Sequence, residues 1–503
     1  MISRICAVAA TLLVFSGSME AQQVHQIEIL HANSMEFDKA LGVNAQRLLG
    51  EVVFKQKDAT MYCDSAWYYS NENKVDAFGD IHILQGDTLS LSGRILNYDG
   101  NTRVAKMRNN VKLVDKDMVL TSPSLDFNIS ESIGYYTEGG VITSQENILK
   151  SQFGYYYSKQ KNFFFKTKVE INNPDYTIYS DTLKYNTQSE IAWFFGPTHI
   201  YSKENYIYCE NGWYNTKTDI SQFSRNSMIK SKDQKITGDS MYYDRNKGFG
   251  RAFNNVSIYD SVQRVILKGQ KAFYTEHPET ALLTERAQMI QISDGDSMFV
   301  HADTLRSVTT DSVKMIRVMR AYYHVKIFKE DLQAKCDSLS YNSADSTIYL
   351  DGDPVVWSDV HQLTATRIYL LMKNNKPFRI SMEDMAFIAS QEDSLKFNQI
   401  RGKEMLGYFV ENQLVKIDVT GNGQTIYYAR DGEITVGVNK AESSDLKIYL
   451  KNKKVDRILF LSQPTSVLYP LQQAPAEELL LRDFRWLDEH RPRNRDEIFI
   501  WHN

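Results

Sequence analysis

Few residues of this chain have the types and spacing that chemistry requires, and the cysteines stand out among them. The tripeptide Cys-Asp-Ser occurs at Cys63–Ser65 and again at Cys336–Ser338, and Cys209 precedes Glu210. A thiol could ligate a metal, and paired cysteines could form a disulfide. The three cysteines beyond the N-terminal segment are an odd number, which does not suit a disulfide framework.

Sequences typical of catalysis or metal binding are absent. The ten histidines are dispersed, and the chain contains no HExxH, CxxC or GxSxG sequence and no phosphate-binding loop. The net charge of −4 gives no reason to expect nucleic-acid binding. We therefore predict no catalytic residue, no metal ligand and no cofactor, and we expect that the protein is not an enzyme.

The two Cys-Asp-Ser tripeptides belong to a repeat of about 29 residues. Its first segment reads Asp, any residue, apolar, any residue, aromatic, as in DTLKY (181–185). The aromatic position recurs in steps of 28 to 31 residues from Tyr68 to Tyr274. The second segment starts with a small or polar residue and then alternates, as in GDIHI (79–83) and NNVSI (254–258). Each period therefore holds two strand-like segments and two turns.

An aspartate opens many of these segments, at Asp64, Asp181, Asp239, Asp303 and Asp337. Acid–base catalysis needs one or two carboxylates in perturbed environments, not one in every repeat. The pattern favours a corner residue whose side chain binds nearby backbone N–H groups. The aspartate nominally shares the inward face with the apolar residues, which a bend in the strand would resolve.

Alternation gives each segment one apolar and one polar face. In DTLKYN, Leu183 and Tyr185 share one face and Lys184 lies on the other. A pair of strands cannot bury an apolar face alone, but stacked copies can. We predict an all-β fold, an elongated antiparallel β-jellyroll whose two sheets open as a V-shaped groove. A parallel β-helix is the alternative, although its coils usually carry three shorter strands.

The inward positions form one candidate apolar surface. They could pack as the core of a closed sandwich or line an open groove, and in a semi-open jellyroll they could do both. The predicted inward positions are Val52, Phe54, Tyr68, Ile81, Ile83, Tyr98, Val111, Leu113, Phe127, Val169, Ile171, Leu183, Tyr185, Met241, Tyr243, Val256, Ile258, Leu339 and Tyr341.

The ends of the chain differ from the repeats. Residues 1–21 combine Arg4, a short apolar run and small residues, which is typical of a cleaved signal peptide. Clear repeats fill residues 24–300, more divergent repeats fill 301–468, and residues 469–503 form a linker and tail. In that tail, EELLLRDFRWLDEH (477–490) has helical spacing. It predicts a short C-terminal helix that caps the last strand or docks to a partner.

The D-x-Φ-x-Y segments (Φ is apolar) and the Φ-x-G-x-V-x-Φ segments, as in DTLKY and AFGDIHI, resemble the OstA/LptA-like domains of lipopolysaccharide transport. The chain is similar to the long OstA-like proteins of the Bacteroidetes type, well over residues 28–300 and weakly over 300–465. The resemblance implies a periplasmic bridge that binds the lipid A acyl chains of lipopolysaccharide in its groove and serves outer-membrane biogenesis. It also implies edge-strand pairing with other jellyroll components at both membranes, and end-to-end self-association.

Our first hypothesis is therefore a lipid-binding transport bridge without catalysis, in the periplasm, soluble or peripheral to a membrane. The alternative is an exported β-solenoid that acts on or adheres to carbohydrate. A solenoid enzyme would gather acids and histidines on a few adjacent repeats, whereas this chain spreads them evenly.

Overall fold

The computed structural model describes residues 25–502, apart from 38–44, 145, 294, 312, 314–315, 375, 433 and 453. These described residues form β-strands and three short 3₁₀ turns but no α-helix. Successive strands pair antiparallel in hairpins. The predicted all-β antiparallel jellyroll is confirmed, and the parallel β-helix alternative is wrong. The expected signal peptide lies outside the described residues.

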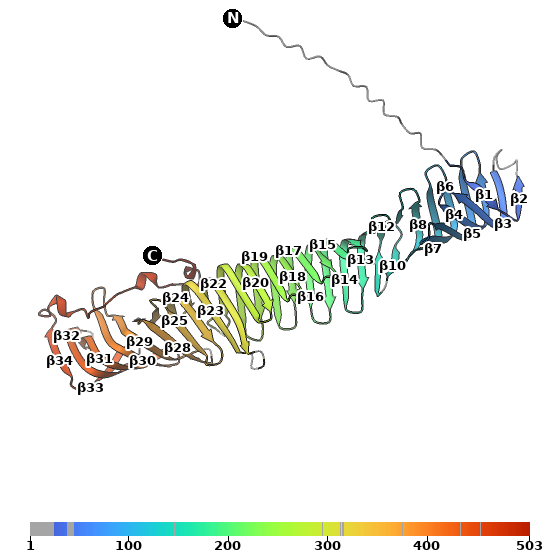
Figure 1. Ribbon diagram of the computed structural model, residues 1–503. Coiled ribbons are helices and arrows are strands. Elements are labelled where there is room, and N and C mark those ends of the chain that lie inside the picture. Colours follow the sequence, from blue (N-terminus) through green and yellow to red (C-terminus); the bar gives the residue numbers. More distant parts are fainter. Residues whose placement is uncertain are drawn as a thin grey trace, which may run out of the picture. The chain divides into compact units, whose positions relative to one another are not determined.

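Two compact units divide the chain, Met1–Asn173 and Pro174–Asn503. Within each unit, consecutive strands lie side by side in chain order (Figure 1). The sequence analysis placed a boundary after residue 300, where the repeats become divergent. That boundary stays a prediction, because the division into compact units does not test how regular the repeats are.

The strands of the first unit are β1 (Glu28–His31), β2 (Ser34–Phe37), β3 (Ala45–Gln56), β4 (Ala59–Tyr69), β5 (Lys74–Gln85), β6 (Leu89–Asp99), β7 (Val104–Asp115), β8 (Met118–Asn128), β9 (Ile133–Tyr136), β10 (Gly140–Ser144), β11 (Asn147–Ser151), β12 (Phe153–Tyr157) and β13 (Asn162–Asn172). The strands of the second unit are β14 (Tyr176–Asn186), β15 (Ile191–Ser202), β16 (Tyr206–Asn215), β17 (Ile220–Lys230), β18 (Gln234–Asp244), β19 (Phe249–Asp260), β20 (Val265–Glu276), β21 (Glu279–Gln291), β22 (Met298–Asp311), β23 (Ile316–Lys329), β24 (Leu332–Asn342), β25 (Thr347–Asp351), β26 (Val355–Ser358), β27 (His361–Thr364), β28 (Arg367–Lys373), β29 (Lys376–Gln391), β30 (Phe397–Val410), β31 (Gln413–Asp431), β32 (Ile434–Lys451), β33 (Lys454–Leu461) and β34 (Thr465–Pro470).

A bulge in the middle of a long strand divides it between two half-sheets. Between β17 and β18, Arg225 and Asn226 together oppose the single residue Asp239. Both bulge residues have a left-handed backbone, with φ of 61° and 53°. Of β18, Gln234–Thr237 lies in what we call half-sheet 1 and Ser240–Asp244 in half-sheet 2. The same shift recurs along both units, so each is a stack of bent strands.

The bulge explains the repeated aspartates. In β4, Cys63 and Ala66 are buried while Asp64 between them is exposed, so the alternation shifts by one residue at the bend. The outward carboxylate of Asp64 accepts the N–H of Asp80 at 2.8 Å. In another repeat, Asp239 accepts the side-chain amide of Asn255 at 3.1 Å. The aspartate therefore holds the bulge of the neighbouring strand.

The position before the aspartate lies at the apex, where the half-sheets converge and little room is left. Cys63, Cys209 and Cys336 occupy it and are 5%, 0% and 1% exposed. All three are free thiols. Gly93 holds the same position in β6, where a Cβ atom would lie 2.5 Å from Cγ of Met107. The cysteines are therefore small apex residues.

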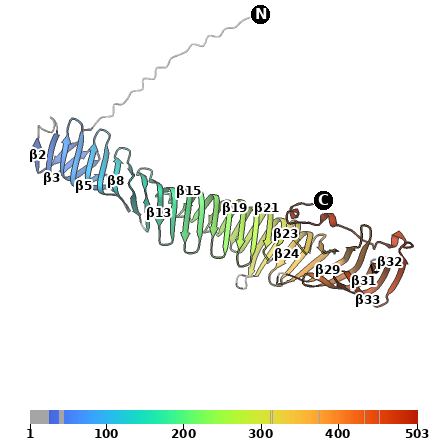
Figure 2. The ribbon, with the colours of Figure 1, turned by 180° about the vertical axis from the view of Figure 1, so that it is seen from behind.

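The tail is not helical. Residues 477–490 contain parts of two 3₁₀ turns, Ala476–Glu478 and Asp488–His490, joined by irregular chain that turns at residues 481–484, and a third turn follows at Glu497–Phe499. The prediction of a short C-terminal helix is therefore wrong. We call residues 479–501 the strap, since they run back along the outer face of half-sheet 1 and end beside β22 and β23 (Figures 1 and 2).

Two buried glutamines of the sheet replace the hydrogen bonds of a helix. The side-chain amide of Gln399 donates to the carbonyl of Leu479 at 2.9 Å and accepts the N–H of Leu481 at 2.8 Å. Gln362 makes the same pair of bonds, both at 2.7 Å, with the strap backbone around Trp486. Each clamp binds the backbone of the strap, so the tail gains its backbone partners from the sheet.

Aromatic contacts fix the strap between and beyond the two clamps. The ring of Phe484 lies 5.1 Å from that of Phe397, and Trp486 lies 5.0 Å from the same ring. At the far end, Phe499 lies 4.7 Å from the ring of His301. The strap therefore buries the outer face of half-sheet 1, which explains why β26 and β27 are buried on both faces.

We predict that the apex thiols of the native protein resist alkylation. Burial raises the pKa of Cys63 and of Cys209 to about 12, so at pH 8 both remain protonated, and the thiolate is the reactive form. Mass spectrometry after maleimide treatment should show all three sites unlabelled in buffer and labelled in denaturant. Rapid native labelling of Cys336 would contradict its apex position.

We also predict that Gln399→Ala loosens the strap. The substitution leaves a backbone carbonyl and an N–H of the strap without partners, at a cost of about 1–3 kcal/mol. Hydrogen exchange at the amide of Leu481 should accelerate accordingly. Gln288→Ala, a substitution on the outer face of β21 away from the clamps, serves as the control and should leave that amide unchanged.

Candidate functional site

The two half-sheets of the second unit enclose an open groove of about 1190 Å³. Its walls come mainly from β14 to β25. Apolar side chains of both half-sheets cover these walls, among them Ile200, Ile229, Met241, Ile258, Met298 and Ile327. An apolar concave surface of this size fits hydrocarbon, because each buried methylene group contributes about 0.8 kcal/mol.

Tyrosines and ion pairs mark the mouth of the groove. Tyr214, Tyr243 and Tyr274 line it near the turns of half-sheet 2. Tyr214 donates to the carboxylate of Asp219 at 2.6 Å. Burial raises the pKa of all three phenols, so they are neutral hydrogen-bond donors at neutral pH. The groove thus passes from an apolar interior to a polar rim.

The predicted inward positions of the first unit lie in a packed core. They are at most 9% exposed. These are Val52, Phe54, Tyr68, Ile81, Ile83, Tyr98, Val111, Leu113, Phe127, Val169 and Ile171. In the closed first unit these side chains therefore pack against other side chains and do not line an open groove.

The predicted inward positions of the second unit are buried or half-buried. The groove is lined by Met241, Tyr243, Val256, Ile258, Leu339 and Tyr341, whereas Leu183 and Tyr185 do not line it. Lipid contact at any of the predicted positions stays a prediction.

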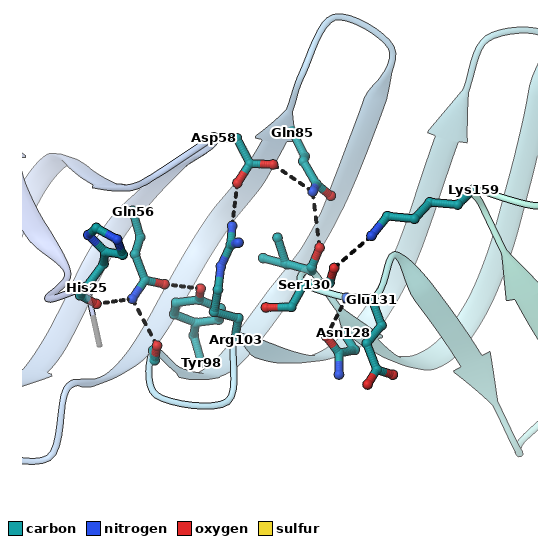
Figure 3. A network of polar contacts seen from close by, with 12 residues as sticks. His25, Gln56, Asp58, Gln85, Tyr98, Arg103, Asn128, Ser130, Glu131 and Lys159 are labelled. Atoms are coloured by element: carbon teal, nitrogen blue, oxygen red, sulfur yellow. Dashed lines mark hydrogen bonds and ion pairs between the residues drawn. The ribbon is translucent and has the colours of Figure 1, made fainter. Parts of the chain in front are cut away.

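Hydrogen bonds across the mouth close the first unit (Figure 3). Gln56, at the end of half-sheet 1, donates to the carbonyl of Gly100 in the opposite row of turns at 2.9 Å and accepts a hydrogen bond from the phenol of Tyr98. Gln85 reaches across in the same way to the carbonyl of Ile129 at 3.2 Å. We call these bonds, with the ion pairs below, the polar belt.

Ion pairs strengthen the polar belt. Arg103 pairs with Asp58 across the mouth at 2.5 Å, and Lys161 pairs with the buried Asp115 at 2.9 Å. Burial opposes ionisation of Asp58, but hydrogen bonds from Gln85 and Arg103 hold the pKa of its carboxyl below the ordinary value. In the second unit, by contrast, Arg317 pairs with Glu279 at 3.2 Å, and both residues belong to the same row of turns.

Sequence reasoning found Met241 but missed the other four methionines of the groove. Met289, Met298, Met319 and Met372 line it with Met241. Four of the five come from strands beyond residue 280, where the aromatic repeat is least regular, so the repeat search passed over them. Their alternation with outward residues, as in MRA (319–321), where the exposed Arg320 separates two inward residues, was the available signal. Unbranched, polarisable thioethers suit a surface that must adapt to chains of different shape.

The described residues contain neither a cluster of three metal-ligating side chains nor a helix long and apolar enough to cross a membrane.

Comparison with known proteins points to one family. The family described as OstA-like protein matches residues 24–181 and 177–239. A search of curated proteins finds no significant match. The match covers the whole first unit from residue 24 and the first strands of the second, where the repeats are clearest. The resemblance to the OstA/LptA-like family is thereby confirmed over residues 24–239, where the chain is similar to OstA-like protein.

Proposed function

We propose that this protein carries lipopolysaccharide through the periplasm by holding its acyl chains in the groove of the second unit, without catalysis. The open apolar groove is the observation that carries the proposal. The OstA-like match supports a role in lipid transport toward the outer membrane. Transfer of this kind needs a continuous apolar surface and no reacting group.

The groove is suited to acyl chains in particular. Its walls are aliphatic and methionine-rich, and its rim carries phenols and ion pairs. An amphiphile could therefore bury its hydrocarbon between the half-sheets while its polar part remains at the mouth. The first unit, closed by the polar belt, could accept acyl chains only if the bonds of Gln56 and Arg103 were broken.

Edge strands with exposed apolar residues support pairing with other jellyroll components or end to end. At the start of the first unit, β1 and β2 pair with β3, and within the described residues no strand covers their other side. There Leu30, Met35 and Phe37 are 55%, 54% and 60% exposed. At the end of the second unit, β34 pairs with β32, and Leu468 is 61% exposed. Open edges of this kind recruit further strands.

Photocrosslinking from adjacent positions of β19 tests the groove. A photoreactive residue at Ile258 should label lipopolysaccharide, because this side chain lines the groove. The neighbouring position Ser257 faces outward and should not. Phe127, buried in the first unit, should label only if the polar belt opens. Equal labelling from positions 257 and 258 would contradict the proposal.

Charge inside the groove should displace lipid without unfolding the protein. Ile258→Asp puts a carboxylate against the acyl chains at a half-buried position that lines the open groove, where water can still reach the charge. Co-purifying lipid, quantified by mass spectrometry, should fall severalfold. Ser257→Asp makes the same change on the outer face, and it should retain the lipid of the parent protein.

A further inference from the structure

A row of tyrosines and lysines crosses the outer face of half-sheet 1 in the second unit. The strand register places its members directly opposite one another from β15 to β19. We call this row the outer stripe: Tyr201, Tyr206, Lys230, Lys235 and Tyr259. Tyr201 is 47% and Tyr259 is 37% exposed, and both lysines are exposed. Aliphatic and phenylalanine side chains continue the row as far as β23.

The outer stripe borders the mouth of the groove. Along each strand, the neighbours of the stripe residues point the other way: Ile200, Ile229, Ile236 and Ile258 line the groove. The stripe lies near the turns that end half-sheet 1, with one layer of backbone between it and the groove. A surface held by the stripe would therefore lie beside the groove opening.

The lysines of the stripe carry charge that the protein does not neutralise. Lys230 lies directly opposite Lys235, an arrangement of like charges that weakens a strand pair. Lys232 lies in the turn between them, and within the described part of the chain none of the three forms an ion pair. Other cations of the mouth do, such as Lys203 with Asp175 at 3.2 Å and Lys329 with Asp296 at 2.7 Å.

The strap covers the continuation of this row on the later strands of half-sheet 1, and there the row binds protein. Beyond β23 the row continues through Gln333, Trp357, Gln362, Ala389 and Gln399, so three of these five residues are glutamines. The three glutamines bind the chain's own C-terminal segment, two of them through its backbone. The outer stripe offers no such amide. Its exposed phenols and free ammonium groups are instead the side chains that concentrate where protein meets the surface of a bilayer.

We propose that the outer stripe docks on an anionic lipid surface and holds the groove mouth against it. Tyrosine rings would lie at head-group depth and the lysines would contact phosphate. Asp233 lies beside Lys232 in the β17–β18 turn, which leaves that hairpin with three lysines and one acid at this end, whereas Glu204 and Asp260 make the neighbouring hairpins less attractive to an anionic surface. The proposed function explains only why docking would be useful, and docking itself needs no lipid in the groove.

Flotation of the full chain with vesicles tests this docking. The parent protein should float with vesicles of 70% phosphatidylcholine and 30% phosphatidylglycerol and remain behind with pure phosphatidylcholine. K230E/K235E should lower the partition coefficient by at least about 25-fold, since each lysine near an anionic surface contributes roughly a factor of five and each glutamate adds repulsion. Tyr201→Ser with Tyr259→Ser should weaken binding to the anionic vesicles as well.

The matched control is R306E/R320E. These arginines are also exposed, directly opposed cations, but they lie on half-sheet 2. The control should float like the parent, and equal loss in both charge variants would overturn the proposal. No flotation of the parent, or a change of oligomeric state in K230E/K235E without a change in flotation, would overturn it too. Ile258→Asp separates the two proposals: it should lose co-purifying lipid yet still float.

Discussion

The mid-strand bulge is the constraint on which the rest of the structure depends. Two residues opposite one shift the alternation, so a single strand can turn its apolar residues toward the same interior on both sides of the bend. The apex then requires a small residue, and the outward aspartate holds the neighbouring bulge. Repeating this unit produces two facing half-sheets, with the turns at the open side.

Polar contacts between the two rows of turns distinguish the closed core of the first unit from the open groove of the second. In the first unit, Gln56, Gln85 and Arg103 reach across the mouth, and the side chains behind them are excluded from water. In the second unit, pairs such as Arg317 with Glu279 stay within one row, and apolar surface remains accessible. The same repeat thus yields either state, and a few polar side chains at the turns decide between them.

The outer face of half-sheet 1 is used in two ways. Where its row carries Gln362 and Gln399, the face binds the backbone of the tail, which becomes a strap rather than a helix. Where the row consists of tyrosine and lysine, the face stays open beside the groove. Both uses leave the inner face free, because neighbouring residues of a strand point to opposite sides.

The sequence by itself determined the repeat, the alternating strands, the inward set from Val52 to Tyr341 and the structural part of Asp64 and its equivalents. Those features follow from local alternation, which a single strand already displays. The tertiary structure decided what alternation cannot express. Leu480 and Phe484 have helical spacing, yet their backbone neighbours bind Gln399, which lies 80 residues away from the carbonyl it binds, so the strap is not a helix. Tyr98 and Tyr243 occupy the same place in the repeat. Tyr98 binds Gln56 across the mouth and is buried, whereas Tyr243 lines the groove. The repeat cannot show this difference, because the residue that reaches Tyr98 comes from another strand, 42 residues away.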